Sequence, residues 1–370
     1  MSRLSVLLLV EQLRRSAAGG IGTYVLGLLQ GLDELAEADR ADAPELTLAA
    51  SRAPRGAVDP LARLGYPLRA SALPGPLLTR GWDHGLVRAP SGVDVVHAVS
   101  LATLESGPAP LVVTVHDLLW RRVPDAYPRR GRHWHEAAMA RALKRAAHFV
   151  VPAEVVAGDL VDAGASPESI TVIPMGSDHM PSPDIAGARS HLATLGVHGP
   201  FLLSVGTLEP RKNLQGLIDA YESVRDELPE PWPLVMVGPS GWGEQVTAGP
   251  GVVLAGTVSA VELSGLYASA RLLAYVPFIE GFGLPPVEAM SVGTPVVASP
   301  LPSTGGAARE VDPHDTASIA SGLLDVATDE AVRSELIRLG SARAAELSWS
   351  SIARRHRDVW ERIAGQRGDL

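Results

Sequence analysis

The chain has 370 residues, of which 46% are hydrophobic and 20% are charged, and this is the composition and length of a globular protein with two domains. It contains no cysteine, which excludes disulfides and cysteine-ligated metals, and its net charge of −9 excludes a general attraction for nucleic acid. Since no signal peptide and no apolar run of roughly 18 residues is evident, we expect a cytoplasmic protein without a membrane span.

The charge is unevenly distributed. Residues 1–180 carry 18 basic and 19 acidic side chains, a net charge of −1, whereas residues 181–370 carry 14 and 22, a net charge of −8. An anion bound by the acidic half must therefore be held by local groups. Of the 32 basic residues only Lys144 and Lys212 are lysines, and each is a candidate for a site that needs a compact ammonium group.

The apolar run Leu4–Val10 predicts a strand that is buried in a parallel sheet. A glycine-rich loop with Gly19, Gly20 and Gly22 follows, and then a helix to about Ala36. Backbone N–H groups in such a loop can bind a phosphate or a hydroxyl. The three glycines are therefore a candidate acceptor- or phosphate-binding loop.

The same segment is an incomplete dinucleotide-binding fingerprint. Val25 stands where the third glycine is expected, and no acid ends the next predicted strand, Glu45–Ala50. Ser51-Arg52 follows instead, which would suit only NADP. An NADP-dependent Rossmann oxidoreductase therefore remains an alternative.

Residues 52–92 are rich in Pro, Gly and Arg, and they predict loops with one short strand near 66–71. Strands follow at 93–98 and 111–114. His116 comes just after the second of these, and ligands of open α/β sheets bind beyond the carboxyl ends of the strands. His116 is a candidate site residue, and the alternative is a structural histidine.

The segment Arg121–Arg145 contains eight basic residues but only two acids, Asp125 and Glu136, with tryptophan and tyrosine interleaved. One interpretation is a solvated helix face with aromatic side chains in the core. The other is an acceptor site for a phosphorylated or lipid-diphosphate-linked sugar, with peripheral contact at the inner membrane face.

A second strand–loop–helix pattern begins at Phe201–Val205, after a proline-rich hinge at 174–200. Its recurrence predicts two βαβ domains, residues 1–180 and 181–349, and a last amphipathic segment follows at 350–366. Further strands are predicted at 148–151, 170–173, 233–237, 252–255, 271–276 and 295–298. Helices are predicted at about 128–144, 154 onward, 214–227, 260–268, 287–291, 316–327 and 330–347.

Two motifs lie at the ends of strands in the second half. The first, Glu209-Pro-Arg211-Lys212-Asn213, places two cations before a helix that Asn213 could cap, and such cations can clamp a diphosphate. The alternative is a capped helix with surface cations. The second motif runs from Glu280 through a glycine turn into a helix that contains Glu288. Its acids should face hydroxyls rather than phosphate, unless they are only a loop acid and a helix-dipole acid.

Together the two motifs resemble those of the retaining glycosyltransferases with the GT-B fold, the family of sucrose synthase and many bacterial mannosyltransferases. The resemblance covers essentially the whole chain and implies an α/β protein with two facing Rossmann-like domains and an interdomain cleft. The first domain would bind the acceptor and the second the nucleotide sugar, and the segment 350–366 would cross back onto the first domain. Catalytic roles would fall to His116, Glu280 and Lys212. The donor would contact Gly206, Thr207, Arg211, Lys212, Phe282, Gly283, Leu284 and Glu288.

The resemblance implies transfer of a hexosyl group, with retention, from a nucleotide-diphosphate sugar to a saccharide, lipid-linked or small-molecule acceptor. Thr207 departs from the arginine of many relatives, and the loop 299–306 is short and lacks their acid. No D-x-D motif in a plausible setting is evident, so we expect neither a metal nor a cofactor. A GT-B epimerase or phosphorylase, or a homologue that only binds, remains an alternative.

Overall fold

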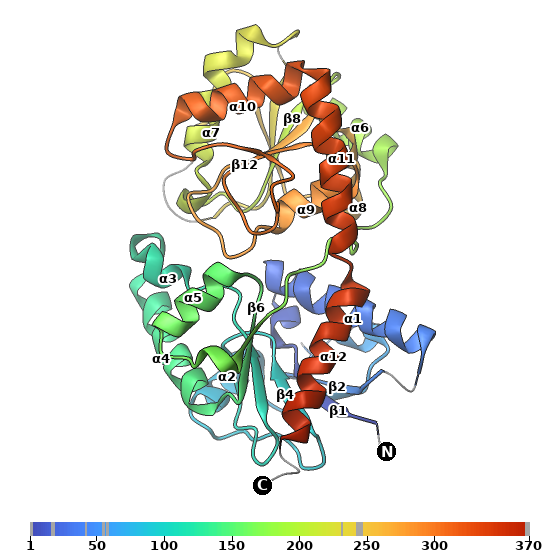
Figure 1. The fold of residues 1–370 in the computed structure, drawn as a ribbon, viewed down its shortest axis with the longest axis vertical. Helices are drawn as coiled ribbons and strands as arrows, with labels where there is room; N and C mark the ends of the chain where they lie inside the picture. The colour runs from blue at the N-terminus through green and yellow to red at the C-terminus, as the bar shows by residue number, and fades with distance from the viewer. Residues whose placement is uncertain are drawn as a thin grey trace. The chain divides into compact units, whose positions relative to one another are not determined.

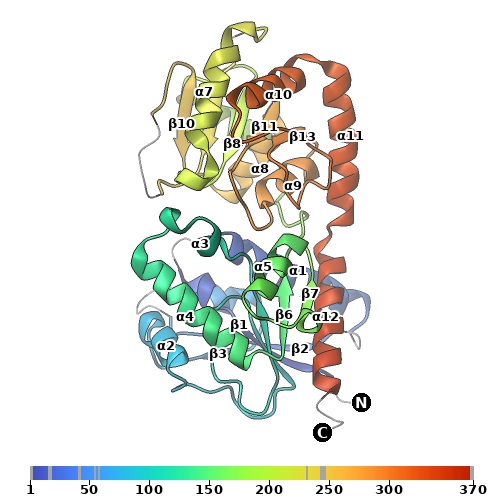
Figure 2. The ribbon, with the colours of Figure 1, turned by 60° about the vertical axis from the view of Figure 1, so that its left-hand side comes forward.

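A computed structural model describes residues 3–15, 19–40, 43–53, 56, 59–230, 232–241 and 247–366. The chain forms two compact units (Figures 1 and 2). The first unit consists of Met1–Met175 and Trp349–Leu370, and the second of Gly176–Ser348. The C-terminal helix is therefore part of the first unit.

The first unit is built on a parallel sheet of seven strands in the order β3-β2-β1-β4-β5-β6-β7. Most of the strands lie where an apolar run predicts them, because a strand covered on both faces needs apolar side chains in both directions. The edge strand β3 is the exception and is mostly exposed. The strands are β1 (Ser5–Leu9), β2 (Glu45–Ala50), β3 (Leu68–Ala70), β4 (Val95–Ala98), β5 (Leu111–Thr114), β6 (His148–Val151) and β7 (Ile170–Val172).

Helices cover both faces of this sheet. Alternate side chains of a strand point to opposite faces. On β4, Val96 packs into the core with helices α2, α4 and α5, whereas His97 stacks on His356 of α12. The helices of the unit are α1 (Gly19–Ala38), α2 (Gly75–Asp83), α3 (Leu119–Arg122), α4 (Arg129–Arg145), α5 (Glu154–Asp162) and α12 (Trp349–Gly365).

Glycines allow α12 to pack closely against α1. A Cβ atom on Gly31 would lie 2.1 Å from the backbone oxygen of Trp349, and one on Gly27 would lie 2.0 Å from the Trp349 ring. No side chain fits between the two backbones at these positions. This contact fixes α12 to the first unit.

Two predictions for the first unit were wrong. Gly19, Gly20 and Gly22 form the first turn of α1 rather than a loop before it, because burial of the following turns outweighs their low helix propensity. Residues 52–92 contain α2 and the 3-10 helix Pro60–Leu64 in addition to loops. Their proline and glycine stand in the first turns, where no backbone donor is missed.

The second unit contains a six-stranded parallel sheet in the order β10-β9-β8-β11-β12-β13. Its core lies between the sheet and helices α7 and α10. The strands are β8 (Leu202–Val205), β9 (Leu234–Val237), β10 (Val252–Gly256), β11 (Leu272–Tyr275), β12 (Val296–Ala298) and β13 (Arg309–Glu310). The helices are α6 (Ile185–Thr194), α7 (Leu214–Val224), α8 (Ala260–Ser269), α9 (Leu284–Ser291), α10 (Thr316–Thr328) and α11 (Glu330–Glu346).

Helix α6 and strand β13 were not predicted. Helix α6 lies in the proline-rich stretch that the sequence assigns to the hinge, and Asp184 caps its first turn. Strand β13 is only two residues long, which is too short for a hydrophobic pattern. Both elements form because the second unit provides surfaces for them to pack on.

Candidate functional site

In the second unit, the cations of the first motif lie beside the first acid of the second motif. Arg211 and Lys212 belong to the 3-10 helix Pro210–Lys212, which follows the end of β8. Glu280 lies in the loop between β11 and α9, and its Oε1 forms ion pairs with both cations. Arg211 also pairs with Glu209. Two cations and two carboxylates thus form one cluster at the carboxyl ends of β8 and β11.

The cluster is buried and further hydrogen-bonded. The side chain of Lys212 is 10% exposed, and that of Glu280 is 12% exposed. The Tyr275 hydroxyl donates to Glu280 at 3.0 Å and accepts from Lys212. Burial opposes ionisation of Glu280, but Lys212 and Arg211 outweigh it and hold the pKa of this carboxyl below its usual value. Glu280 is therefore an ionised partner of both cations.

Two further residues of the predicted site are glycines, Gly206 and Gly283. The side chain of Lys212 lies over Gly206, where a Cβ atom would be 3.6 Å from its Cε. Gly283 has φ +90 just before α9, and a Cβ there would be 3.2 Å from Leu301 and from Ser303. Thr207 follows Gly206 in the same loop and has no ion-pair role.

Glu288 lies in α9, where both of its carboxylate oxygens are occupied. Its Oε1 is 3.1 Å from the His179 Nε2, and its Oε2 accepts a 2.9 Å bond from the Tyr267 hydroxyl. Phe282 and Leu284 are buried at the start of the same helix. The two acids of the motif are thus held by different partners, Glu280 by cations and Glu288 by a histidine and a tyrosine.

The predicted cap by Asn213 is wrong. Asn213 stands before α7 with φ 54, but its side chain makes no capping bond. Its amide donates instead to the Pro313 carbonyl at 2.7 Å. This bond ties the Arg211–Lys212 loop to the segment after β13.

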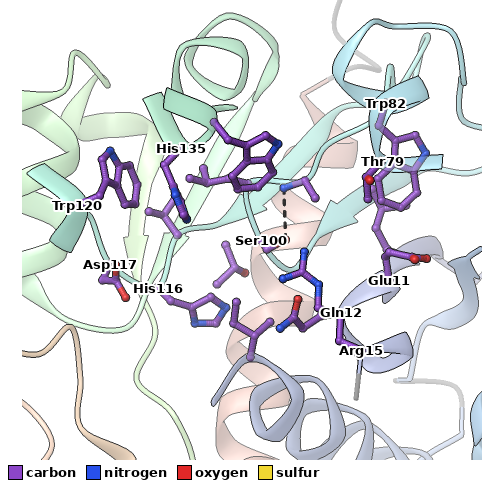
Figure 3. Close-up of a pocket in the computed structure, with 17 residues that line it drawn as sticks. Glu11, Gln12, Arg15, Thr79, Trp82, Ser100, His116, Asp117, Trp120 and His135 are labelled. Atoms are coloured by element: carbon purple, nitrogen blue, oxygen red, sulfur yellow. Dashed lines mark hydrogen bonds between the residues drawn. The ribbon is translucent and has the colours of Figure 1, made fainter. Parts of the chain in front are cut away.

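The first unit contains a cavity of about 260 Å³ that His116 lines (Figure 3). His116 follows β5, and its Nε2 lies 2.9 Å from the Val99 carbonyl. Since a carbonyl only accepts, Nε2 carries the proton and Nδ1 keeps its lone pair. Burial lowers the pKa of His116 to about 4, so the ring is neutral at neutral pH. His116 can therefore accept a hydrogen bond from a ligand hydroxyl.

Helix α1 also reaches this cavity. Ile21, between two of the predicted glycines, lines it. Tyr24 meets the His116 ring edge-on, with centroids 4.9 Å apart. Its hydroxyl lies 2.7 Å from the His356 Nε2 and 3.0 Å from the Thr114 Oγ1. The segment Gly19–Gly22 thus lies beside His116, in helical rather than loop conformation.

Sequence reasoning missed several residues that line the cavity, among them Glu11, Thr79, Trp82 and His135. Glu11 directly follows β1, as His116 follows β5, so the same strand-end argument would have found it. Thr79 and Trp82 lie on α2, which was expected to be a loop. His135 lies within the basic segment, where no sequence pattern distinguishes it from its neighbours.

In that basic segment, four arginines are neutralised by acids. The pairs are Arg121 with Glu136, Arg122 with Asp159, Arg141 with Asp83, and Arg145 with Glu105. Three of these acids lie outside the segment, so the sequence pattern overstates its positive charge. In the part of the chain that the structure describes, no helix is long and apolar enough to cross a bilayer.

The described residues contain no group of three or more acids or histidines that could hold a metal ion. Metal independence remains a prediction.

Family models match both halves of the chain. Residues 18–180 match the model "Glycosyltransferase Family 4" and residues 195–341 match "Glycosyl transferases group 1". The O-antigen chain mannosyltransferase B of Escherichia coli is 30% identical over 65% of this chain and 67% of its own length. A D-inositol 3-phosphate glycosyltransferase of Acidothermus cellulolyticus is 28% identical over 90% and 83%. The chain spans only 20% of the E. coli mannosyltransferase WbdA, with 31% identity over 41% of this chain.

Solved structures share the fold. Anabaena HepE in complex with UDP and glucose superposes with a TM-score of 0.70, at 19% identity and full coverage of both chains. Sucrose-phosphate synthase of Thermosynechococcus elongatus gives 0.72, also at 19% identity, over 98% of this chain and 100% of its own. The expected α/β fold with two parallel-sheet domains and the resemblance to GT-B glycosyltransferases are confirmed. Retention remains a prediction. The chain belongs to the glycosyltransferases with the GT-B fold.

Proposed function

We propose that the protein transfers a hexosyl group of mannosyl, rhamnosyl or glucosyl type, with retention, from a nucleotide-diphosphate sugar to an acceptor hydroxyl. The observation that carries this proposal is the buried cluster of Arg211, Lys212 and Glu280 beside Gly206. Two cations at the carboxyl ends of parallel strands suit a diphosphate.

The donor diphosphate would replace Glu280 as the partner of Arg211 and Lys212. Glu280 would then be available to accept hydrogen bonds from the sugar hydroxyls. Glu288 would accept bonds from the ribose, since a carboxylate oxygen that already holds one hydrogen bond keeps a second lone pair. HepE structures contain UDP and UDP-glucose, which supports a nucleotide-sugar donor here. The base and the sugar are left to experiment.

Transfer breaks the bond between the anomeric carbon and the diphosphate. Arg211 and Lys212 would stabilise the charge that develops on the leaving diphosphate, which is usually the largest catalytic contribution. The acceptor oxygen would attack from the side of the leaving group, and a diphosphate oxygen would take its proton. The resemblance assigns His116 to the donor sugar near the reacting carbon, where a neutral imidazole can accept a hydroxyl proton in a hydrogen bond.

The acceptor would be a saccharide, a lipid-linked saccharide or a small molecule. The printed names of the relatives indicate an O-antigen chain for one and D-inositol 3-phosphate for another. A lipid-linked acceptor would bring the protein to a membrane surface through basic residues such as Arg129 and Arg132, which form no ion pair with the acids that the structure describes. The competing GT-B reactions, epimerisation and phosphorolysis, need no separate acceptor alcohol.

Thermal shifts with UDP-, GDP- and dTDP-sugars would identify the donor, and proton NMR of the product would give its anomeric configuration. Lys212→Ala should lower turnover at least tenfold, about 1.4 kcal/mol of transition-state stabilisation. The matched control is Lys144→Ala, which removes the other lysine, at an exposed position of α4. Wild-type turnover in Lys212→Ala would refute the proposed role of Lys212 in binding the diphosphate. Thermal stabilisation by NADPH alone would favour an oxidoreductase.

A further inference from the structure

The cavity of the first unit is bordered by a buried carboxylate that no motif includes. Glu11 begins the 3-10 helix Glu11–Arg14 after β1 and is 8% exposed. Its Oε2 accepts a hydrogen bond from the backbone N–H of Ser51 at 2.6 Å. Its Oε1 has no hydrogen-bond partner, and Glu11 forms no ion pair, within the residues that the structure describes.

The first residue of α2 leaves space for this carboxylate. A Cβ atom on Gly75 would lie 2.6 Å from the Glu11 Oε1. Gly75 does not have a positive φ, so the backbone conformation alone does not require a glycine. The glycine instead makes room for the oxygen that has no partner.

A purely structural role would not need a charge at this position. Burying a carboxylate with a single hydrogen bond and no cation costs free energy. A neutral glutamine could link the ends of β1 and β2 through the same bond to Ser51. A carboxylate oxygen without a partner among the described residues is instead suited to a hydrogen bond from a ligand hydroxyl.

The opposite side of the cavity is aromatic. Figure 3 shows Glu11, Thr79 and Trp82 on one side, and His116, Trp120 and His135 on the other. The rings of Trp120 and His135 stack with centroids 4.7 Å apart at 25°. His135 donates from Nδ1 to the Gly131 carbonyl at 2.8 Å, which leaves Nε2 for a ligand. A cavity with apolar rings and a few polar groups is typical of small-molecule sites.

The charges around the cavity favour a neutral ligand. Its lining includes two carboxylates, Glu11 and Asp117, and one guanidinium, Arg15, and His116 is neutral there. Among the described residues that line the cavity, carboxylates thus outnumber guanidinium groups, which disfavours a phosphate. Two further arginines, Arg14 and Arg52, line a neighbouring cavity that shares Glu11, and Arg14 is already paired with Asp59.

We propose that this cavity binds the terminal sugar of the acceptor as a neutral saccharide, through Glu11, and selects it over a phosphorylated sugar. This assignment rests on the proposed glycosyl transfer and narrows its acceptor class. Glu11 accepts hydrogen bonds from ring hydroxyls, and the aromatic side packs on the C–H face of the ring.

The test is an NMR titration of the full chain with the methyl α-glycosides of mannose, glucose, galactose and rhamnose. Mannose 6-phosphate and glucose 6-phosphate provide matched anions. The variants are Glu11→Gln, which keeps the bond to Ser51, and Glu45→Gln as a control at the exposed start of β2. At least one glycoside should bind to wild type and to Glu45→Gln, and more tightly than either phosphate. Glu11→Gln should weaken this binding at least fivefold and leave the thermal transition unchanged. It should also reduce the difference in affinity between the glycoside and the sugar phosphates.

The proposal is overturned if no glycoside binds, if a phosphate binds more tightly than every glycoside, or if Glu11→Gln behaves as wild type. A second titration with UDP and GDP reports on the second unit alone. Glycoside binding through Glu11 without nucleotide binding would keep this inference and refute the proposed transfer. Nucleotide binding without glycoside binding would do the reverse.

Discussion

The two units carry different kinds of polar groups at the carboxyl ends of their strands. In the second unit, Arg211 and Lys212 are both already paired with Glu280. In the first unit, His116 is neutral, and one oxygen of Glu11 has no partner among the residues that the structure describes. A ligand of the second unit must therefore exchange existing ion pairs, whereas a ligand of the first unit can add hydrogen bonds without breaking any.

The largest expected effect is that acid destabilises the first unit before the second. Burial lowers the pKa values of His116 and His356 to about 4, and lowers that of His97 well below 6.5. A histidine with a lowered pKa in the folded state stabilises fully above pH 6.5 and loses that contribution as pH falls toward 4. For His116 and His356 this contribution is on the order of 3 kcal/mol each. Glu280 has a lowered carboxyl pKa, so its contribution persists until pH falls below about 4.5.

Between pH 6.5 and 4.5 the first unit should therefore lose stability while the second keeps it. Hydrogen exchange at pH 7.5 and 5.5, corrected for intrinsic rates, would show lost protection in β4 and β5 but not in β11. An equal loss of hydrogen-exchange protection in both units would contradict the predicted difference in their acid stability. Replacing the exposed His133 by glutamine is the control and should change nothing.

The packing of α12 gives the next largest effect. Gly31→Ala places a methyl group 2.1 Å from the Trp349 backbone oxygen, and overpacking of this kind costs about 1–3 kcal/mol. Gly158→Ala in α5 is the matched control, since its Cβ would meet nothing within 4 Å. Urea denaturation should show destabilisation by Gly31→Ala only. Equal stability of the two variants would show that α1 and α12 adjust at no cost.

Glu280→Gln tests whether the ion pairs of the second unit compete with the donor. Turnover should fall about 10- to 100-fold, because a hydrogen bond with a charged group is worth about 1.5–3 kcal/mol. The affinity for UDP or GDP should rise, since Arg211 and Lys212 lose their competing carboxylate. Calorimetric titration and initial rates measure both effects, with Glu335→Gln on the surface as the control. Weaker nucleotide binding by Glu280→Gln would contradict the proposal that the diphosphate replaces Glu280 as the partner of the two cations.

The smallest effect is expected from Tyr267→Phe. This change removes the hydroxyl that donates to the Glu288 Oε2 at 2.9 Å and leaves His179 to hold the carboxylate alone. Nucleotide affinity should fall about three- to tenfold, because a single hydrogen bond contributes about 0.5–1.5 kcal/mol. Tyr66→Phe in the first unit, which loses a bond to Asp33, should keep wild-type affinity. If both variants bind the nucleotide equally well, Glu288 does not need this support.

Much of the fold could be predicted because buried parallel strands are short apolar runs. Runs such as Leu4–Val10 and Phe201–Val205 are legible in the sequence alone. Helix α6 and strand β13 were missed because neither has a strong pattern of its own. Both motifs of the second unit were found because their residues are close in sequence and stand at strand ends.

The amino-acid sequence by itself determined most strand positions, the two-unit organisation and the proximity of each motif to a strand end, since these follow from local hydrophobic patterns. The tertiary structure alone decided which charges meet. Glu280 binds Arg211 and Lys212, about 70 residues earlier in the chain, and Asp83 and Glu105 neutralise arginines of α4. The cavity around Glu11 and His116 likewise depends on side chains from separate elements, because distances between residues far apart in sequence are set by packing.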